Sequence, residues 1–147
     1  MNNTYKITTK SDEETIEVAQ NLESEKFPNM VICLNGDLGS GKTVFTKGFA
    51  SAMAIEDVTS PTFNIIKEYI GELPLYHIDV YRTNGKIDNL GIEEYFDKGG
   101  VTIIEWAEMI EDVLPLERLD ITFKITGENS RVMLITPHGE KYLRVCE

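Results

Sequence analysis

The strongest constraint on the fold comes from residues 30–34, an unbroken apolar run that ends at Asn35 and Gly36. A short apolar run rich in β-formers predicts a strand buried on both faces, as in a parallel sheet. A helical repeat follows at i, i+3, i+4 and i+7: Phe45, Gly48, Phe49 and Ala52. It predicts a helix that begins near Lys42 and buries this stripe. The order is therefore strand, glycine-rich turn, helix.

The segments around this unit alternate between the two periodicities. Residues 5–8 read as a short strand, and a capping box at Ser11 to Glu14 predicts a helix to about Glu23. Its apolar positions have helical spacing: Ile16, Ala19 and Leu22. Residues 64–70 and 75–81 are rich in β-formers and flank a turn at residues 71–74, which predicts a hairpin.

The second half repeats the order of strand and helix and then changes character. Residues 101–104 predict another buried strand, and a helix stopped by Pro115 should bury Trp106, Met109, Ile110 and Val113. Antiparallel strands are expected where apolar residues then alternate: Ile121, Phe123 and Ile125; Val132 and Leu134; Leu143 and Val145. We expect one α/β domain spanning residues 1–147, with a central, largely parallel sheet and antiparallel additions.

Composition excludes several classes of protein. No apolar run approaches the roughly 20 residues that cross a bilayer, and no secretory signal is visible, so we expect a cytoplasmic protein without a membrane role. The two cysteines, Cys33 and Cys146, suit reduced thiols. Fourteen basic against twenty-five acidic residues give a net charge of −11, which repels nucleic acid. Any role on RNA is expected to be indirect.

The turn after the first buried strand matches the P-loop (Walker A) pattern of Gly, four residues, Gly-Lys and Ser or Thr. Its residues, the expected nucleotide-binding set, are Gly36, Asp37, Leu38, Gly39, Ser40, Gly41, Lys42 and Thr43. The glycines let backbone N–H groups surround a phosphate, and the helix N-terminus adds partial positive charge. Lys42 supplies a charge near the β and γ phosphates, and the Thr43 hydroxyl can bind Mg²⁺. We therefore expect a P-loop NTPase-like fold that binds a nucleotide.

A P-loop also needs an acid at the end of a neighbouring strand to hold Mg²⁺. Asp79 comes late in the β-rich segment 75–81, and Glu105 directly follows the more apolar segment 101–104. From the residues alone, either acid could be the one that holds Mg²⁺.

Two other nucleotide-dependent classes are less well supported. Two Asp-x-x-Gly matches, at residues 88–91 and 97–100, are suggestive of a GTPase, but neither clearly follows a buried strand, and no Asn-Lys-x-Asp reads guanine. Adenine is therefore favoured. A small-molecule kinase usually brings several arginines to the transferring phosphate, whereas this chain has four in all: Arg82, Arg118, Arg131 and Arg144.

Three further stretches stand in order behind the glycine-rich turn: Ser60-Pro61-Thr62-Phe63, His77-Ile78-Asp79-Val80-Tyr81-Arg82 and Ile104-Glu105-Trp106. Together with the P-loop, they make the chain resemble the TsaE (YjeE) family across roughly residues 5 to 136. The resemblance implies an ATPase that works with TsaD and TsaB on the threonylcarbamoyl modification of adenosine 37 in tRNA. Contact with tRNA is expected only through that complex.

The resemblance also implies roles for single residues. Thr43 and Glu105 become the expected Mg²⁺ ligands, Asp79 takes a catalytic or supporting role, and Trp106 lies beside the nucleotide. Thr62 is expected to help position the attacking water. The alternative is that its segment is only a turn stiffened by Pro61.

Trp106 and Arg131 each allow two interpretations. Taken alone, Trp106 more often packs in a core, and Arg131 either reaches the nucleotide or forms a surface ion pair. His77, Asp79 and Tyr81 alternate on a predicted strand and should share one face, where a hydrogen-bonded polar site is possible. The rival to an ATPase is a non-catalytic module whose assembly depends on a nucleotide.

Overall fold

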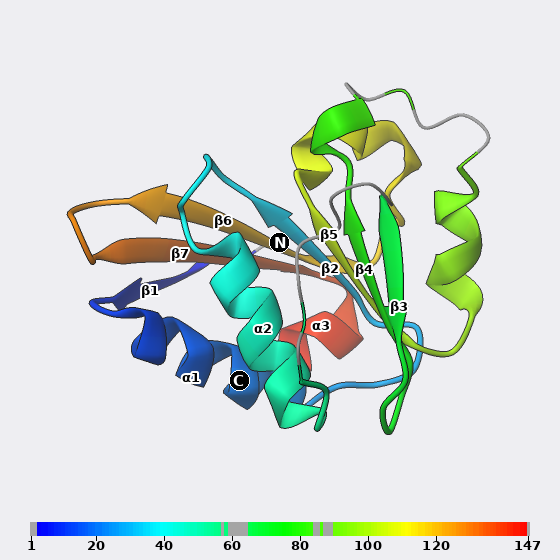
Figure 1. Cartoon of the computed structure of the whole chain (residues 1–147), viewed down its shortest axis with the longest axis horizontal. Coiled ribbons are helices and arrows are strands. Elements are labelled where there is room, and N and C mark those ends of the chain that lie inside the picture. The colour runs from blue at the N-terminus through cyan, green and yellow to red at the C-terminus, as the bar shows by residue number, and fades with distance from the viewer. Residues whose placement is uncertain (1–2, 57, 59–64, 84–85, 87–89, 147) are drawn as a thin grey trace.

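The computed structural model describes residues 3–56, 58, 65–83, 86 and 90–146 (Figure 1). Its seven strands form one sheet, in the order β1-β7-β6-β2-β5-β4-β3. The strands are β1 (Tyr5–Thr9), β2 (Val31–Asn35), β3 (Ile66–Tyr69), β4 (Leu75–Asp79), β5 (Val101–Glu105), β6 (Arg118–Ile125) and β7 (Arg131–His138). The four central strands β6, β2, β5 and β4 are parallel, while β7, β1 and β3 add antiparallel edges. The predicted fold class is confirmed.

The parallel centre follows from its apolar sequence. Strand β5 is buried along its whole length and β2 along its first four residues, as expected for strands covered on both faces. Strand β6 pairs in parallel with β2 and antiparallel with β7. The alternation of Ile121 and Phe123 therefore marked a half-buried strand correctly, but its orientation depends on a partner that is distant in the chain.

Three α-helices contribute to the larger of two core clusters: α1 (Asp12–Glu23), α2 (Lys42–Ala52) and α3 (Glu140–Val145) (Figure 1). Helix α1 is capped by Ser11, whose side chain accepts a hydrogen bond from the Glu14 N–H, so its predicted capping is confirmed. Helices α1 and α2 meet at Gly48, where a Cβ atom would lie 2.9 Å from the Ile16 Cα. This close approach explains a glycine inside a helix, where it otherwise costs about 1 kcal/mol.

The smaller cluster lies on the opposite face of the central strands and includes Cys33, Ile78 and Ile104. It packs against the 3-10 segments η2 (Ile92–Asp97) and η3 (Ala107–Val113), and a third such turn, η1 (Tyr81–Thr83), follows β4. Both cysteines are free thiols, as predicted. No helix among the described residues is long and apolar enough to cross a membrane.

Four sequence expectations about local structure are wrong. Ala52 is exposed, and α2 instead buries Phe45, Thr46, Phe49 and Ala50. Tyr81 lies beyond the end of β4, so it does not share a strand face with His77 and Asp79.

The other two concern short segments of mixed periodicity. Residues 107–113 form 3-10 turns kinked at Ile110 rather than an α-helix. The Glu108 N–H is bound by the Asn35 side chain, which fixes where this segment begins. Leu143 and Val145 lie in α3 rather than in a strand, because a run this short fits either period and Tyr142 with Val145 has helical spacing.

Candidate functional site

The glycine-rich loop, residues 36–43, joins the end of β2 to the start of α2. Gly36 has φ +142°, and a Cβ atom there would lie 2.7 Å from the Phe123 carbonyl oxygen. Gly41 has φ +111° and precedes α2 without a side-chain cap. The first N–H groups of a helix lack partners within that helix and attract anions. The loop therefore offers backbone donors for a phosphate group.

Lys42 is the first residue of α2 and is only 5% exposed. Its Nζ donates a hydrogen bond to the Gly36 carbonyl oxygen and lies 3.4 Å from the centre of the Trp106 ring. Burial lowers the pKa of Lys42, and the surrounding acids Glu108, Glu105, Asp79 and Asp37 act in the opposite direction. A cation is thus held inside the loop, where the sequence predicted a phosphate-binding charge.

Thr43, Glu105 and His77 form a chain of hydrogen bonds beneath the loop. The Thr43 hydroxyl lies 3.2 Å from Glu105 Oε1, and His77 Nε2 lies 2.5 Å from Glu105 Oε2. Glu105 is 3% exposed and the His77 side chain is fully buried. The structure therefore brings together both predicted metal ligands, and it adds an imidazole from β4.

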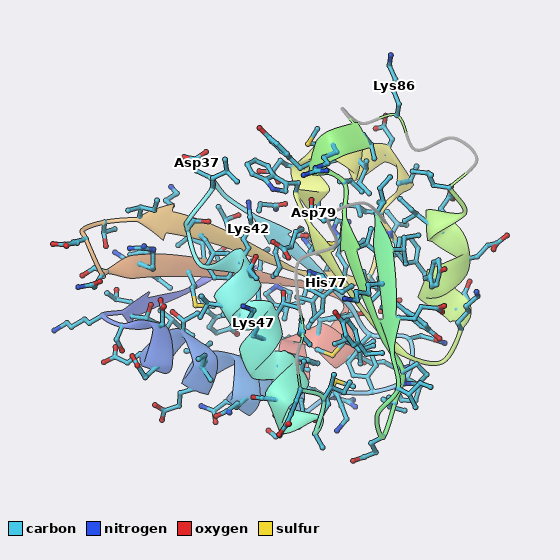
Figure 2. The ribbon with its side chains drawn as sticks, viewed as in Figure 1. Asp37, Lys42, Lys47, His77, Asp79 and Lys86 are labelled. Carbon is cyan, nitrogen blue, oxygen red and sulfur yellow. The ribbon has the colours of Figure 1, made fainter. Side chains whose placement is uncertain are left out.

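Asp79 is in register with Glu105 on the neighbouring parallel strand, so the two acids lie side by side at the strand ends. Its Oδ1 accepts a hydrogen bond from the Tyr81 N–H. Burial raises the pKa of Asp79 and nearby Glu105 raises it further, whereas the Tyr81 N–H, His77 and Lys42 lower it. Figure 2 shows Lys42 and Asp79 entering this region from α2 and from the end of β4, with Asp37 at the loop tip.

Trp106 lies between the smaller core cluster and the glycine-rich loop. It is half-buried against the smaller core cluster, yet its ring also faces the loop through Lys42. The Tyr81 ring lies 4.7 Å away, centre to centre. Trp106 adopts the left-handed conformation with φ 64°, which is unusual for a large side chain and is typical of functional sites.

Arg131 holds the tip of the glycine-rich loop. Its Nη2 donates to the Gly39 carbonyl oxygen at 3.1 Å, and Nη1 donates to the carbonyl oxygens of Ser130 and Gly127 at 2.8 and 3.1 Å. The guanidinium thus ties the loop to the β6–β7 turn. Around it, Asp37 and Leu38 are exposed, whereas Ser40 is buried and its hydroxyl has no partner among the described residues.

Sequence reasoning missed two residues that support the loop. Glu108 Oε2 lies 3.3 Å from the Gly36 nitrogen, and Asn35 Oδ1 accepts the Glu108 N–H. Neither position stands out by periodicity or motif, since each contact joins segments more than 70 residues apart. Thr62, the predicted water-positioning residue, lies outside the described residues.

Comparisons with known proteins agree with this architecture. The family model described as "Threonylcarbamoyl adenosine biosynthesis protein TsaE" matches residues 9–133. The tRNA threonylcarbamoyladenosine biosynthesis protein TsaE of Bacillus subtilis is 48% identical over 95% of this chain and 89% of its own length. The protein of the same name from Rickettsia bellii is 36% identical over 86% of this chain and 90% of its own.

A solved structure gives the same result. The crystal structure of Bacillus subtilis YdiB superposes with a TM-score of 0.87 at 44% identity, covering 99% of this chain and 93% of that one. Both the family model and the relatives cover most of the chain. The chain therefore belongs to the TsaE family, whose members take part in tRNA threonylcarbamoyladenosine biosynthesis.

Proposed function

We propose that this protein binds ATP with Mg²⁺ on the glycine-rich loop and hydrolyses it in support of threonylcarbamoyl modification of adenosine 37 in tRNA. The observation that carries the proposal is the convergence of Lys42, Thr43, Glu105 and Asp79 at the end of the parallel strands, directly under a helix N-terminus. Ligand crevices in open α/β sheets lie at this end of the strands.

The donor set fits a magnesium ion. Thr43 and Glu105 offer a hydroxyl and a carboxylate, the oxygen ligands that Mg²⁺ prefers. Among the described residues, no group of three or more His, Cys, Asp or Glu side chains could hold a metal alone. The protein would then supply part of the coordination shell, and phosphate oxygens and water would supply the rest. When bound, Mg²⁺ neutralises charge on the β and γ phosphate oxygens.

The remaining groups bind and orient the nucleotide. Backbone N–H groups of the loop bind the phosphates, and Lys42 exchanges its bond to the Gly36 carbonyl for a phosphate oxygen. Asp79 helps position the attacking water; the raised pKa of its partly buried carboxyl suits a group that exchanges protons with water. Arg131 fixes the loop tip from behind through Gly39.

A Lys42→Ala variant tests the proposal. It should lose ATP hydrolysis and bind ATP far more weakly while the fold stays intact, which circular dichroism checks. Lys47 lies on the same helix and is exposed (Figure 2), so Lys47→Ala is the matched control and should hydrolyse ATP at the wild-type rate. Unchanged hydrolysis in folded Lys42→Ala would remove the nucleotide site from this loop.

TsaD and TsaB are the proposed partners, in the cytoplasm, and they should accelerate a slow intrinsic hydrolysis. Arg118 is engaged with Asp120, and Arg131 with loop carbonyls. An arginine supplied by a second protein can be worth roughly 10³ to 10⁵ in rate. The net charge of −11 suits docking to a basic surface. Steady-state ATPase with and without the partners tests this: an unchanged rate would favour a self-sufficient hydrolase.

A further inference from the structure

His77 is an unexpected residue for the interior of a strand. It lies in the middle of β4, its side chain is fully buried, and its neighbours Tyr76 and Ile78 are buried as well. A buried polar group costs free energy unless it is hydrogen-bonded. An aliphatic residue would avoid the cost of removing an imidazole from water, so the contacts of the imidazole should show what it does.

The imidazole has one polar contact among the described residues. Nε2 lies 2.5 Å from Glu105 Oε2, whereas Nδ1 has no hydrogen-bond partner there. As a metal ligand Glu105 is ionised, and an ionised carboxylate only accepts hydrogen bonds, so Nε2 is the donor in this arrangement. Among the described residues, the imidazole therefore bonds to Glu105 alone. Its full burial also separates it from any bound nucleotide.

Both carboxylate oxygens of Glu105 therefore have a partner. Oε2 accepts from His77 on β4, and Oε1 lies 3.2 Å from the Thr43 hydroxyl on α2. Asp79 is in register beside it on β4, and two neighbouring carboxylates repel each other. Without the donor from His77, Glu105 would be free to turn away from the loop.

We infer that His77 is a positioning residue that fixes the Glu105 carboxylate toward Thr43 and so sets the Mg²⁺ requirement of the site. This inference rests on the proposed function, because it takes Glu105 as a metal ligand. Partners that orient metal-binding side chains typically contribute 10-fold to 100-fold in metal affinity. The imidazole is 0% exposed and acts through Glu105.

The test measures binding of a fluorescent mant-ADP across a series of Mg²⁺ concentrations, with the full chain and one nucleotide concentration throughout. His77→Leu should bind mant-ADP without Mg²⁺ as the wild type does, but need roughly tenfold more Mg²⁺ for the half-maximal gain in affinity. In steady-state hydrolysis, its rate should return toward wild type at saturating Mg²⁺. A structural defect would lower binding at every Mg²⁺ concentration.

Amide variants separate the hydrogen bond from the packing. The Gln amide nitrogen reaches about as far from the backbone as the imidazole Nε2, whereas the Asn amide reaches only as far as Nδ1. His77→Gln should therefore restore the wild-type Mg²⁺ requirement, and His77→Asn should not. This pair carries the test if His77→Leu does not fold. His138→Leu is the matched control, since it removes the other imidazole–carboxylate contact, 2.8 Å from Asp120.

The outcomes separate the two proposals. A wild-type protein without Mg²⁺-dependent mant-ADP binding overturns both. A responsive wild type with a normal Mg²⁺ requirement in His77→Leu, or in His77→Asn, overturns the role of His77 alone. So does a His77→Gln variant as impaired as His77→Asn.

Discussion

The chain contains two histidines, and each contacts a carboxylate in a different region. His77 and Glu105 are 0% and 3% exposed, lie in the middle of β4 and at the end of the parallel strand β5, and have Thr43 as their third member. His138 and Asp120 are 23% and 20% exposed, lie on the antiparallel β6–β7 pair, and have Arg118 as their third member. The same chemical pair thus occurs once inside the candidate site and once at a partly exposed position on β6 and β7.

Surroundings rather than residue type separate these pairs. An ion pair near solvent contributes between zero and about 1 kcal/mol, so the Arg118–Asp120–His138 group is a modest link between two strands. The buried pair cannot be compensated by water and must be satisfied within the protein. The free-energy cost of burying this pair is understandable at a site where a carboxylate has to face a ligand.

The largest expected difference between the regions is in catalysis. Glu105→Gln keeps the shape but removes the charge, so hydrolysis at low Mg²⁺ should fall about 1,000-fold, since a bound metal is worth several kcal/mol in such sites. High Mg²⁺ should recover much of the loss. Asp120→Asn should stay within about twofold of the wild type. Equal losses in steady-state assays would mean that the buried pair has no special role.

Asp79→Asn sharpens the assignment within the buried region. Because Asp79 is proposed to act on water, its loss should lower kcat about 100-fold and leave the half-saturating Mg²⁺ concentration nearly unchanged. A Mg²⁺ titration of hydrolysis measures both. If Asp79→Asn instead shifts the Mg²⁺ requirement and Glu105→Gln does not, the two acids exchange roles.

Stability should separate the histidines by a smaller margin. His77→Leu leaves one oxygen of the buried Glu105 without its donor, which should cost about 1–3 kcal/mol of unfolding free energy. His138→Leu, at a partly exposed position, should lower the free energy of unfolding by less than about 1 kcal/mol. Urea unfolding of both variants provides the values, and a reversed order would contradict the distinction drawn from burial.

The smallest expected effect concerns the thiol of Cys33, which lies next to the partly exposed Asp120–His138 pair. Cys33 is fully buried and in register with Asp120, and burial raises the pKa of its thiol. Cys146 is half-buried. A thiol reagent should therefore label Cys146 first in the native protein, and Asp120→Asn should leave Cys33 protected. Rapid labelling of Cys33 in that variant would show that the pair keeps this part of the sheet closed.

Local sequence predicted the elements that carry the site. The apolar runs of β2 and β5 and the glycine pattern between β2 and α2 are strong local signals, and they placed Lys42, Thr43 and Glu105 correctly at element ends. The choice between Asp79 and Glu105 could not be made locally. Their adjacency depends on β4 pairing with β5.

Contacts between distant segments account for what could not be predicted. The His77–Glu105 bond joins residues 28 apart, and the Arg131–Gly39 bond joins residues 92 apart. The sequence allowed a polar site near His77 and Asp79 but gave no partner for the imidazole. For Arg131 it offered a nucleotide contact or a surface ion pair, and it did not predict the bonds from the guanidinium to loop carbonyls.

The most direct test of the central claim is calorimetric titration of ADP into the wild type and Glu105→Gln, each with and without Mg²⁺. The claim is that the glycine-rich loop binds the nucleotide and Glu105 holds its metal. Without Mg²⁺ the two proteins should bind ADP alike, and adding Mg²⁺ at a low concentration should tighten binding in the wild type only. An equal gain in both proteins would contradict Glu105 as the metal ligand, and no binding by the wild type would contradict the nucleotide site itself.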